Sequence, residues 1–317
     1  MILVFFLFLA VLTIYLSIKL SYYADNVSKT TKVSIEAVGG ILLAGITSLP
    51  ELITCFSSIY LNNIYLAVGD ILGSNLFNIC IICFFDIIFI RKMFFNKTCR
   101  KTLIYILLLI NYLFIFLSLN GNVNISLFNI GIPTFVIFIT YIFYIKRIVN
   151  KENHEETSSN VVKKEKGLIL KFILTALSLI IISTLLTITV NKISILNPSF
   201  SSSFIGAILL GITTSLPEVI TFISLIKLNN YDMALSDILG SNLFNLLVLA
   251  IGDIILRKNQ IYYYADFSNL LILKLCIVTT LISFLQNKRN KSLSKITYII
   301  PSIIIVLLYI LFWILNV

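Results

Sequence analysis

The chain has 317 residues, of which 59% are hydrophobic and 12% are charged, and its mean hydropathy is +1.02. A soluble domain has roughly 45–50% apolar and 25% charged residues, so this composition excludes a water-soluble globular fold. The formal net charge of +10 does not indicate a nucleic-acid partner, because the basic residues are distributed among loops and do not gather on one surface.

Long apolar runs follow one another along the whole chain. A helix needs about 20 apolar residues to cross the ~30 Å hydrocarbon core of a bilayer. Runs of this length predict an all-α polytopic membrane protein with about ten membrane-spanning helices. The predicted spans cover residues 2–22, 33–61, 64–90, 101–119, 126–147, 169–190, 200–228, 233–256, 267–286 and 296–316.

The basic residues alternate between the two sides of this arrangement. Connections that follow odd-numbered spans carry 20 Lys and Arg, whereas those that follow even-numbered spans carry 3. Loops rich in Lys and Arg face the cytoplasm. We therefore expect a multi-pass protein of the plasma membrane with both termini outside the cell.

Two blocks of sequence occur twice. T-S-L-P-E stands at 47–51 and 214–218, and D-I-L-G-S-N-L-F-N stands at 70–78 and 237–245. A shift of 167 residues aligns both pairs without a gap, with 25 of the 40 positions from Ile41 to Cys80 identical. A shared N-N between the blocks predicts the turn of a helical hairpin. Five spans separate the copies, and this odd number predicts an inverted repeat, as in many secondary transporters.

The duplication divides the chain into two five-helix halves. The first half covers residues 1–147 and contains repeat 1 at about 39–86, and the second covers 169–317 and contains repeat 2 at about 206–253. Residues 148–168 are polar and mixed in charge, which predicts a short cytoplasmic linker.

Each T-S-L-P-E copy places polar groups in the middle of an apolar span. Pro50 and Pro217 have no backbone N–H, so each leaves the carbonyl four residues earlier without its helical partner. Such irregular backbone is stable at membrane depth only where it is buried in protein or lines a wet cavity. Glu51 and Glu218 would each cost at least ~2.5 kcal/mol in hydrocarbon, which favours a functional role.

The repeated blocks supply a particular kind of ligand. Thr47 and Ser48 lie within one helical turn of Glu51, and the second block adds further hydroxyl and amide oxygens. Oxygen ligands without sulfur or imidazole suit Na⁺ and Ca²⁺. If the two inverted hairpins face each other, these oxygens converge near the bilayer centre. Two carboxylates neutralise the charge of one Ca²⁺ and leave three Na⁺ with one excess positive charge. These charges permit the exchange of one ion for the other.

The blocks G-I-T-S-L-P-E (45–51), G-I-T-T-S-L-P-E (211–218) and G-S-N-L-F-N (73–78 and 240–245) resemble the α-repeats of the sodium/calcium exchanger family, within the cation/calcium antiporter superfamily. The resemblance implies ten helices, with the two hairpins as the core and spans 1 and 6 sliding across it to alternate access. It also implies that ions bind to Thr47, Ser48, Glu51, Ser74, Asn78, Thr214, Ser215, Glu218, Ser241 and Asn245, with backbone oxygens near Ala44 and Gly211.

We therefore expect a secondary active antiporter that exchanges Na⁺ for Ca²⁺, with three Na⁺ for one Ca²⁺ implied by the resemblance. We expect no enzyme activity and no cofactor, and the partners are the two ions and the lipid bilayer. The sequence does not predict an oligomeric state. The alternatives are a Ca²⁺/H⁺ antiporter, a cation channel and an intramembrane aspartyl protease. The protease is disfavoured because A-V-G-D at 67–70 lacks the first glycine of the G-x-G-D pattern.

Two further pairs of aspartates correspond under the same shift. The family usually has Asn where this chain has Asp70 and Asp237, which could add charge, bind a proton, or cap and pair near the helix start. Asp86 and Asp253 lie near Arg91 and Arg257 at the ends of their spans. For these we expect interfacial ion pairs.

Overall fold

The computed structural model describes residues 2–31, 33–119, 126–127, 129–152, 167–196, 213–256, 259–264, 267–289 and 294–316. In these ranges, eight helices are long and apolar enough to cross a membrane, and the bent helix pair Ile35–Thr47 and Leu49–Tyr60 makes a ninth. The all-α polytopic membrane fold is therefore confirmed, with the number ten as an approximation. The predicted span at 200–228 lies partly outside the described residues.

The structure is built almost entirely of helices. They are α1 (Ile2–Thr30), α2 (Ile35–Ala37), α3 (Ala44–Thr47), α4 (Leu49–Tyr60), α5 (Ile64–Ile88), α6 (Phe94–Lys97), α7 (Thr102–Leu119), α8 (Ile132–Glu152), α9 (Leu168–Leu196), α12 (Leu216–Lys227), α13 (Tyr231–Leu256), α14 (Phe267–Lys288) and α15 (Lys295–Asn316). A π-helix, η1, covers Val38–Leu43, and a 3₁₀-helix, η2, covers Ile261–Tyr264. The strands β1 (Ser126–Leu127) and β2 (Ile130–Gly131) form a short antiparallel pair.

The end of α8 lies inside the segment that we expected to be a linker. α8 runs to Glu152, so the first five residues of 148–168 are helical. Residues 153–166 lie outside the described residues.

The chain forms two compact units, each made of separate stretches. The first unit comprises Met1–Ile53 and Ile145–Ser241, and the second comprises Thr54–Tyr144 and Asn242–Val317. Three helices, α4, α8 and α13, contribute residues to both units.

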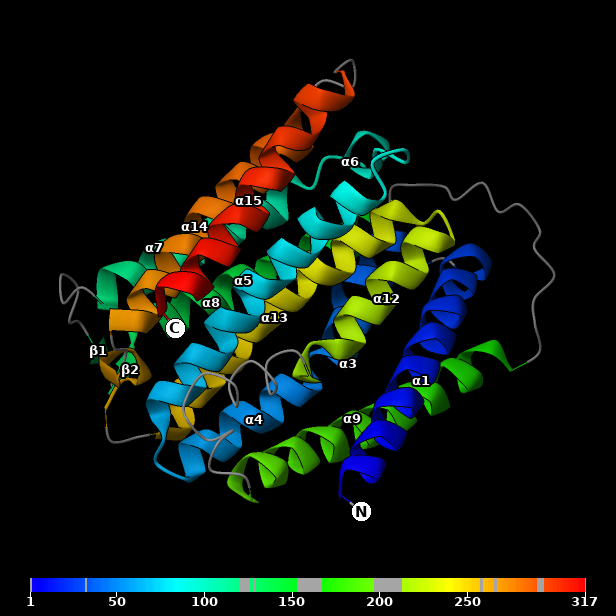
Figure 1. Cartoon of the computed structure of the whole chain (residues 1–317). Coiled ribbons are helices and arrows are strands. Elements are labelled where there is room, and N and C mark those ends of the chain that lie inside the picture. Colours follow the sequence, from blue (N-terminus) through cyan, green and yellow to red (C-terminus); the bar gives the residue numbers. More distant parts are fainter. Residues whose placement is uncertain are drawn as a thin grey trace. The chain divides into compact units, whose positions relative to one another are not determined.

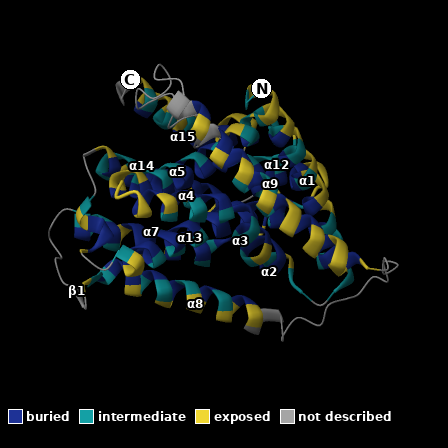
Figure 2. Ribbon diagram, turned by 90° about the horizontal axis from the view of Figure 1, so that it is seen from below, coloured by how far each residue is buried: buried dark blue, intermediate teal, exposed yellow. Residues whose placement is uncertain are grey.

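In the first unit, α1 packs along α9 and also against α12 (Figure 1). α1 and α9 expose many large apolar side chains, such as Leu3, Phe8, Ile169 and Ile181 (Figure 2). Lipid tails are as apolar as leucine, so such faces are expected of helices in contact with the bilayer.

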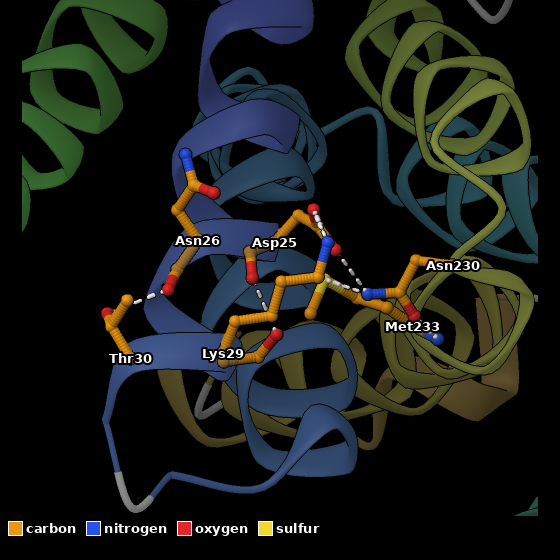
Figure 3. Close-up of polar contacts among 7 residues, drawn as sticks. Asp25, Asn26, Lys29, Thr30, Asn230 and Met233 are labelled. Carbon is orange, nitrogen blue, oxygen red and sulfur yellow. Dashed lines mark hydrogen bonds and ion pairs between the residues drawn. The ribbon is translucent and has the colours of Figure 1, made fainter. Parts of the chain in front are cut away.

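A buried carboxylate joins α1 to the turn between α12 and α13 (Figure 3). Asp25 is 3% exposed, and its Oδ1 accepts a hydrogen bond from Asn230 Nδ2 at 2.8 Å. Its Oδ2 pairs with Lys29 Nζ at 2.6 Å. Asn230 Oδ1 accepts in turn from the backbone N–H of Met233, at the start of α13 (3.2 Å). One aspartate thus satisfies donors from two elements of this unit.

The two repeated hairpins turn in the same way. Asn62 and Asn229 have φ values of 58° and 59° and follow α4 and α12. The amide of the next residue bonds to the carbonyl five residues earlier, at 2.8 Å in the first repeat and 2.9 Å in the second. This is a Schellman-type helix end, in which asparagine is tolerated because it adopts the left-handed conformation more readily than most residues. The turn predicted at N-N is confirmed in both copies.

In the second unit, α5 packs against α14 and α15, and α14 packs against α7 (Figure 1). Asp86, near the end of α5, is fully buried and accepts hydrogen bonds from Tyr298 Oη, Ser302 Oγ (2.7 Å) and Gln286 Nε2 (3.1 Å). The prediction that Asp86 forms an ion pair with Arg91 is wrong. In the described chain, Asp86 accepts hydrogen bonds from uncharged donors of α14 and α15. Such donors stabilise a buried carboxylate without a cation.

Asp253, the corresponding residue in the second repeat, has similar surroundings in the same unit. It accepts hydrogen bonds from the backbone N–H of Gly131 (2.9 Å), from Thr134 Oγ1 (2.6 Å) and from the backbone N–H of Ile261 (2.6 Å). Arg257, its expected partner, lies outside the described residues. Within the described ranges, the hydrogen bonds to both aspartates come from neutral groups.

Candidate functional site

The helix that carries each T-S-L-P-E block breaks at the serine. Ser48 has φ −89° and ψ 9°, and Ser215 has φ −84° and ψ 7°. In the first repeat the helices on either side of the break are bent by 41°. Pro50 and Pro217 follow two residues later, where they cannot donate to the preceding turn. The interruption predicted from the prolines is confirmed at the same position in both repeats.

The two glutamates lie in the first unit and bond crosswise to the two serines. Ser48 Oγ donates to Glu218 Oε1 at 3.1 Å, and Ser215 Oγ donates to Glu51 Oε1 at 3.2 Å. All four side chains are at most 1% exposed. Each serine therefore stabilises the carboxylate of the other repeat, which is the two-fold pattern expected of an inverted pair. The arrangement gathers two carboxylates and two hydroxyls in one buried cluster.

Further oxygens of the first unit adjoin this cluster. Thr47 Oγ1 donates to the carbonyl of Leu43 at 3.1 Å and lies 3.4 Å from Ser241 Oγ. Ser241 Oγ lies 3.5 Å from the carbonyl oxygen of Ala44. Thr214 is also fully buried. The first unit thus contains Ala44, Thr47, Ser48, Glu51, Thr214, Ser215, Glu218 and Ser241 of the predicted ligands, whereas Gly211 lies outside the described residues.

The chemistry of this cluster suits a hard cation. Glu218 Oε2 is buried and accepts no hydrogen bond within the described part of the chain. A buried acceptor without a partner loses the free energy of its hydration, and a cation restores it. Within the described residues, His, Cys, Asp and Glu form no group of three or more that could hold a metal ion. A cation held there would have two carboxylates and neutral oxygens as its ligands.

The remaining predicted ligands, Ser74, Asn78 and Asn245, belong to the second unit, where an amide network joins α5 and α13. Asn75 and Asn242 each donate from Nδ2 to the backbone carbonyl of the other, at 3.1 Å in both directions. Asn78 Nδ2 donates to Asn242 Oδ1 (2.9 Å), and Asn245 Nδ2 donates to Asn75 Oδ1 (3.0 Å). The Oδ1 atoms of Asn78 and Asn245 and the Oγ of Ser74 are buried and have no hydrogen-bond partner among the described residues.

Asn75 and Asn242 were missed by the sequence analysis. They occupy the same position in the two copies of G-S-N-L-F-N, and both are completely buried. A buried amide is costly unless its donors and acceptors are bonded. An asparagine inside an apolar span, repeated in both copies, was the signal that could have found them.

Asp70 and Asp237 bond within their own hairpins. Thr54 Oγ1 donates to Asp70 Oδ2 at 2.6 Å, and Thr221 Oγ1 donates to Asp237 Oδ2 at 2.9 Å. The two threonines also correspond under the shift of 167 residues. Of the roles left open for these aspartates, pairing is therefore present, and the charge and proton roles stay predictions.

Comparison with curated proteins finds similar membrane proteins. The chain is 23% identical over 275 residues to inner membrane protein YrbG of Escherichia coli (strain K12), covering 83% of each chain. It is 26% identical over 237 residues to the uncharacterized membrane protein MJ0091 of Methanocaldococcus jannaschii, covering 74% of this chain and 75% of that one. It is 25% identical over 251 residues to the putative antiporter CaxA of Alkalimonas amylolytica, covering 77% and 78%.

Solved structures and a family model also match this chain. A structure of the sodium-calcium exchanger NCX_Mj soaked with Na⁺ and Sr²⁺ matches with a TM-score of 0.70 and 21% identity, over 98% of this chain and 96% of that one. A second structure of NCX_Mj, soaked with 10 mM Na⁺ and zero Ca²⁺, matches with a TM-score of 0.69 and 20% identity, over 98% of each chain. The family described as sodium/calcium exchanger protein matches residues 1–147 and 168–317. The chain therefore belongs to the sodium/calcium exchanger family.

Proposed function

We propose that this protein is a secondary active antiporter that extrudes Ca²⁺ across the plasma membrane in exchange for entering Na⁺, by alternating access. The observation that carries this proposal is the crossed pair of hydrogen bonds, Ser48 to Glu218 and Ser215 to Glu51, between the two broken helices. Family membership supports it independently.

The proposed ligands in the first unit are all oxygens. Glu51 and Glu218 supply two negative charges, and Ca²⁺ takes about six to eight oxygens, so neutral groups must complete its shell. We assign these to the hydroxyls of Thr47, Ser48, Thr214, Ser215 and Ser241 and to backbone carbonyls near Ala44 and Gly211. The assignment of Ser74, Asn78 and Asn245 to the same ions rests on the repeated motif.

Exchange follows from the cost of buried charge. An uncompensated carboxylate in a low-dielectric interior costs several kcal/mol by an order-of-magnitude estimate, so Glu51 and Glu218 oppose reorientation of the protein without bound cations. One Na⁺ leaves a net negative charge on the pair, whereas one Ca²⁺ neutralises it. The two carboxylates therefore favour conformational change only with a full load of either ion, which couples the two fluxes.

The orientation in the membrane forms part of the proposal. The basic loops assign both termini to the outside and residues 148–168 to the cytoplasm. The two halves, 1–147 and 169–317, would then have opposite topologies around this linker.

A transport assay tests the proposal. Proteoliposomes loaded with Na⁺ are diluted into Na⁺-free buffer that contains ⁴⁵Ca²⁺, beside K⁺-loaded controls and the Glu51→Gln and Glu218→Gln variants. We expect Ca²⁺ uptake that requires internal Na⁺ and is lost in both variants, because each substitution removes one of the two charges. Uptake that proceeds equally in K⁺-loaded liposomes would refute Na⁺ coupling.

Ca²⁺/H⁺ exchange is the second candidate, and the buried aspartates favour it. Asp237 is fully buried, Thr221 donates to its Oδ2, and its Oδ1 has no hydrogen-bond partner in the described chain. Protonation would relieve the cost of burying this charge. Ca²⁺ uptake that ignores Na⁺, follows an imposed pH gradient and is abolished by Asp70→Asn or Asp237→Asn would establish this alternative.

A further inference from the structure

Asn75 and Asn242 each present only their amide oxygen to a neighbouring asparagine, which is Asn245 for Asn75 and Asn78 for Asn242. The Nδ2 of each donates to the backbone carbonyl of the other, and Asn75 Nδ2 also donates to Tyr112 Oη at 3.1 Å. Their Oδ1 atoms therefore point away from these bonds, toward Asn245 and Asn78 respectively. An amide whose nitrogen is bound in this way cannot exchange its two ends without losing its donors.

The Oδ1 acceptors of Asn75 and Asn242 determine which way the neighbouring amides point. Asn245 Nδ2 donates to Asn75 Oδ1, and Asn78 Nδ2 donates to Asn242 Oδ1. A flipped amide would oppose two oxygens and leave both buried without a donor, which is costly. In the observed orientation the Oδ1 atoms of Asn78 and Asn245 remain buried, with no hydrogen-bond partner among the described residues.

The orientation matters because the two ends of an amide differ in charge. The oxygen of a primary amide is a cation ligand, whereas the NH₂ group carries partial positive charge and repels a cation. An asparagine that flipped freely would present the wrong end part of the time. A fixed amide presents its oxygen without reorganisation.

We propose that Asn75 and Asn242 are positioning residues for cation transport, which hold the amides of Asn245 and Asn78 with the oxygen available to the transported ion. This inference rests on the proposed function, and it goes beyond it by assigning a role to two residues that bind no ion themselves. Partners of a metal ligand typically change affinity by about 10–100-fold when they are removed.

A double-mutant cycle separates positioning from support of the fold. Asn75→Leu removes the acceptor of Asn245 Nδ2, and Asn245→Asp replaces the amide by a carboxylate, whose two oxygens need no orientation. The Ca²⁺ dissociation constant is measured by isothermal titration on detergent-purified protein for wild type, both single variants and the double variant. Na⁺-driven Ca²⁺ uptake gives KM and kcat, and a melting curve without added ions reports folding.

We expect Asn75→Leu to raise the Ca²⁺ dissociation constant about 10-fold or more in the wild-type background, with the rise in KM exceeding any fall in kcat. In the Asn245→Asp background the same substitution should change it less than about 3-fold, because no amide remains to be oriented. The mirror cycle, Asn242→Leu with Asn78→Asp, should give the same result.

Tyr112→Phe is the matched control. It removes one partner of Asn75 Nδ2 but leaves the bond from Asn245 Nδ2 to Asn75 Oδ1 in place. This variant should melt at a lower temperature and keep its Ca²⁺ affinity within about 3-fold of wild type.

Several outcomes overturn the inference. An equal loss of affinity in both backgrounds would assign Asn75 a purely structural role, and so would failure of both leucine variants to fold. An unchanged Ca²⁺ dissociation constant in Asn75→Leu would show that Asn75 does not position a ligand. A wild-type protein that binds neither Ca²⁺ nor Na⁺ would refute the proposed function itself, and the inference with it.

Discussion

Ser48 and Ser215 each stabilise a carboxylate that belongs to the opposite repeat. A hydrogen bond from an uncharged donor to a buried carboxylate contributes about 1.5–3 kcal/mol. Because the two bonds are related by the repeat, neither glutamate is positioned by its own helix alone. A substitution in one repeat therefore acts on the charge carried by the other.

Alanine at either serine should weaken ion binding to a similar extent. For both Ser48→Ala and Ser215→Ala we expect the Ca²⁺ dissociation constant to rise about 10-fold, as loss of a charge-assisted bond predicts. Isothermal titration of the purified protein measures it. Ser224→Ala is the control, since Ser224 Oγ bonds to the carbonyl of Ile220 in its own helix. A loss at only one serine would mean that the two glutamates hold Ca²⁺ unequally.

Asparagine at Asp70 and Asp237 tests whether these aspartates do more than pair with threonine. The amide oxygen can still accept from Thr54 or Thr221, and a buried charge is removed. Under Na⁺/Ca²⁺ exchange we expect the double variant to keep its uptake rate within about 3-fold and to gain about 1 kcal/mol or more of stability without ions. Uptake and melting temperature are the measurements. Loss of Na⁺-driven uptake in a folded variant would give the aspartates a direct role in transport.

The candidate ligands could be predicted from the sequence where polarity itself was the signal. Glu51 and Glu218 stand out because a carboxylate is rare in an apolar span, and its repetition excludes chance. The environment of Asp86 could not be predicted, because its partners Tyr298 and Ser302 lie more than 200 positions away in sequence. Rules based on local spacing consider only residues near Asp86 in sequence, such as Arg91, and cannot identify Tyr298 or Ser302 as partners.

The hairpins owe their geometry to features that sequence does reveal. Proline within a span predicts an interruption of the helix, which the structure places at Ser48 and Ser215. The N-N pair predicts the hairpin turn, in which the structure shows Asn62 and Asn229 to be left-handed. The π-helix at Val38–Leu43 was not predicted. A π-helix is rare in proteins, so there was no reason to expect one there from the sequence.

The small residues of the second hairpin arm permit a close approach in the first unit. A Cβ atom on Gly240 would lie 2.3 Å from the carbonyl oxygen of Gly40 and 2.7 Å from its Cα. Both atoms are backbone, so the contact can be relieved only by moving a helix. Glycine at position 240 therefore permits an approach of the two backbones that a side chain would prevent. Gly73, its counterpart, has no such neighbour within 4 Å in the described chain.

Alanine substitutions should separate these two glycines. We expect Gly240→Ala to destabilise the protein by about 3 kcal/mol, the upper end for overpacking. Gly73→Ala should be neutral or stabilising by up to ~1 kcal/mol, because alanine favours a helix more than glycine does. Melting temperatures in detergent compare them. Equal losses would show that the two positions are packed alike.

At the scale of the whole molecule, the repeats and the compact units divide the chain differently. The first unit takes α1 and α3 from the first half of the sequence and α9 and α12 from the second. The crossed serine and glutamate bonds in that unit also join the two halves. Periodicity in the sequence predicts the repeats, whereas the units arise from contacts between residues that are far apart in sequence.

The orientation of the molecule in the membrane can be read from one native cysteine. Cys99 is exposed, whereas Cys55, Cys80, Cys83 and Cys276 are buried. Cys99 lies in a connection with five Lys and Arg residues, which predicts a cytoplasmic position. A membrane-impermeant maleimide should therefore label Cys99 in inverted vesicles and not in intact cells.

A cysteine on the opposite side completes the test. Tyr60 is 87% exposed at the end of α4, next to a loop that carries no basic residue. In a Cys99→Ser background, Tyr60→Cys should be labelled in intact cells. Reversed labelling at both positions would show that the topology is the opposite of the one proposed. Na⁺ would then enter the protein from the other ends of the same helices. Labelling of both from one side would contradict the hairpin of α4 and α5 as a membrane-crossing pair, because one helix of spanning length, α5, lies between the two positions.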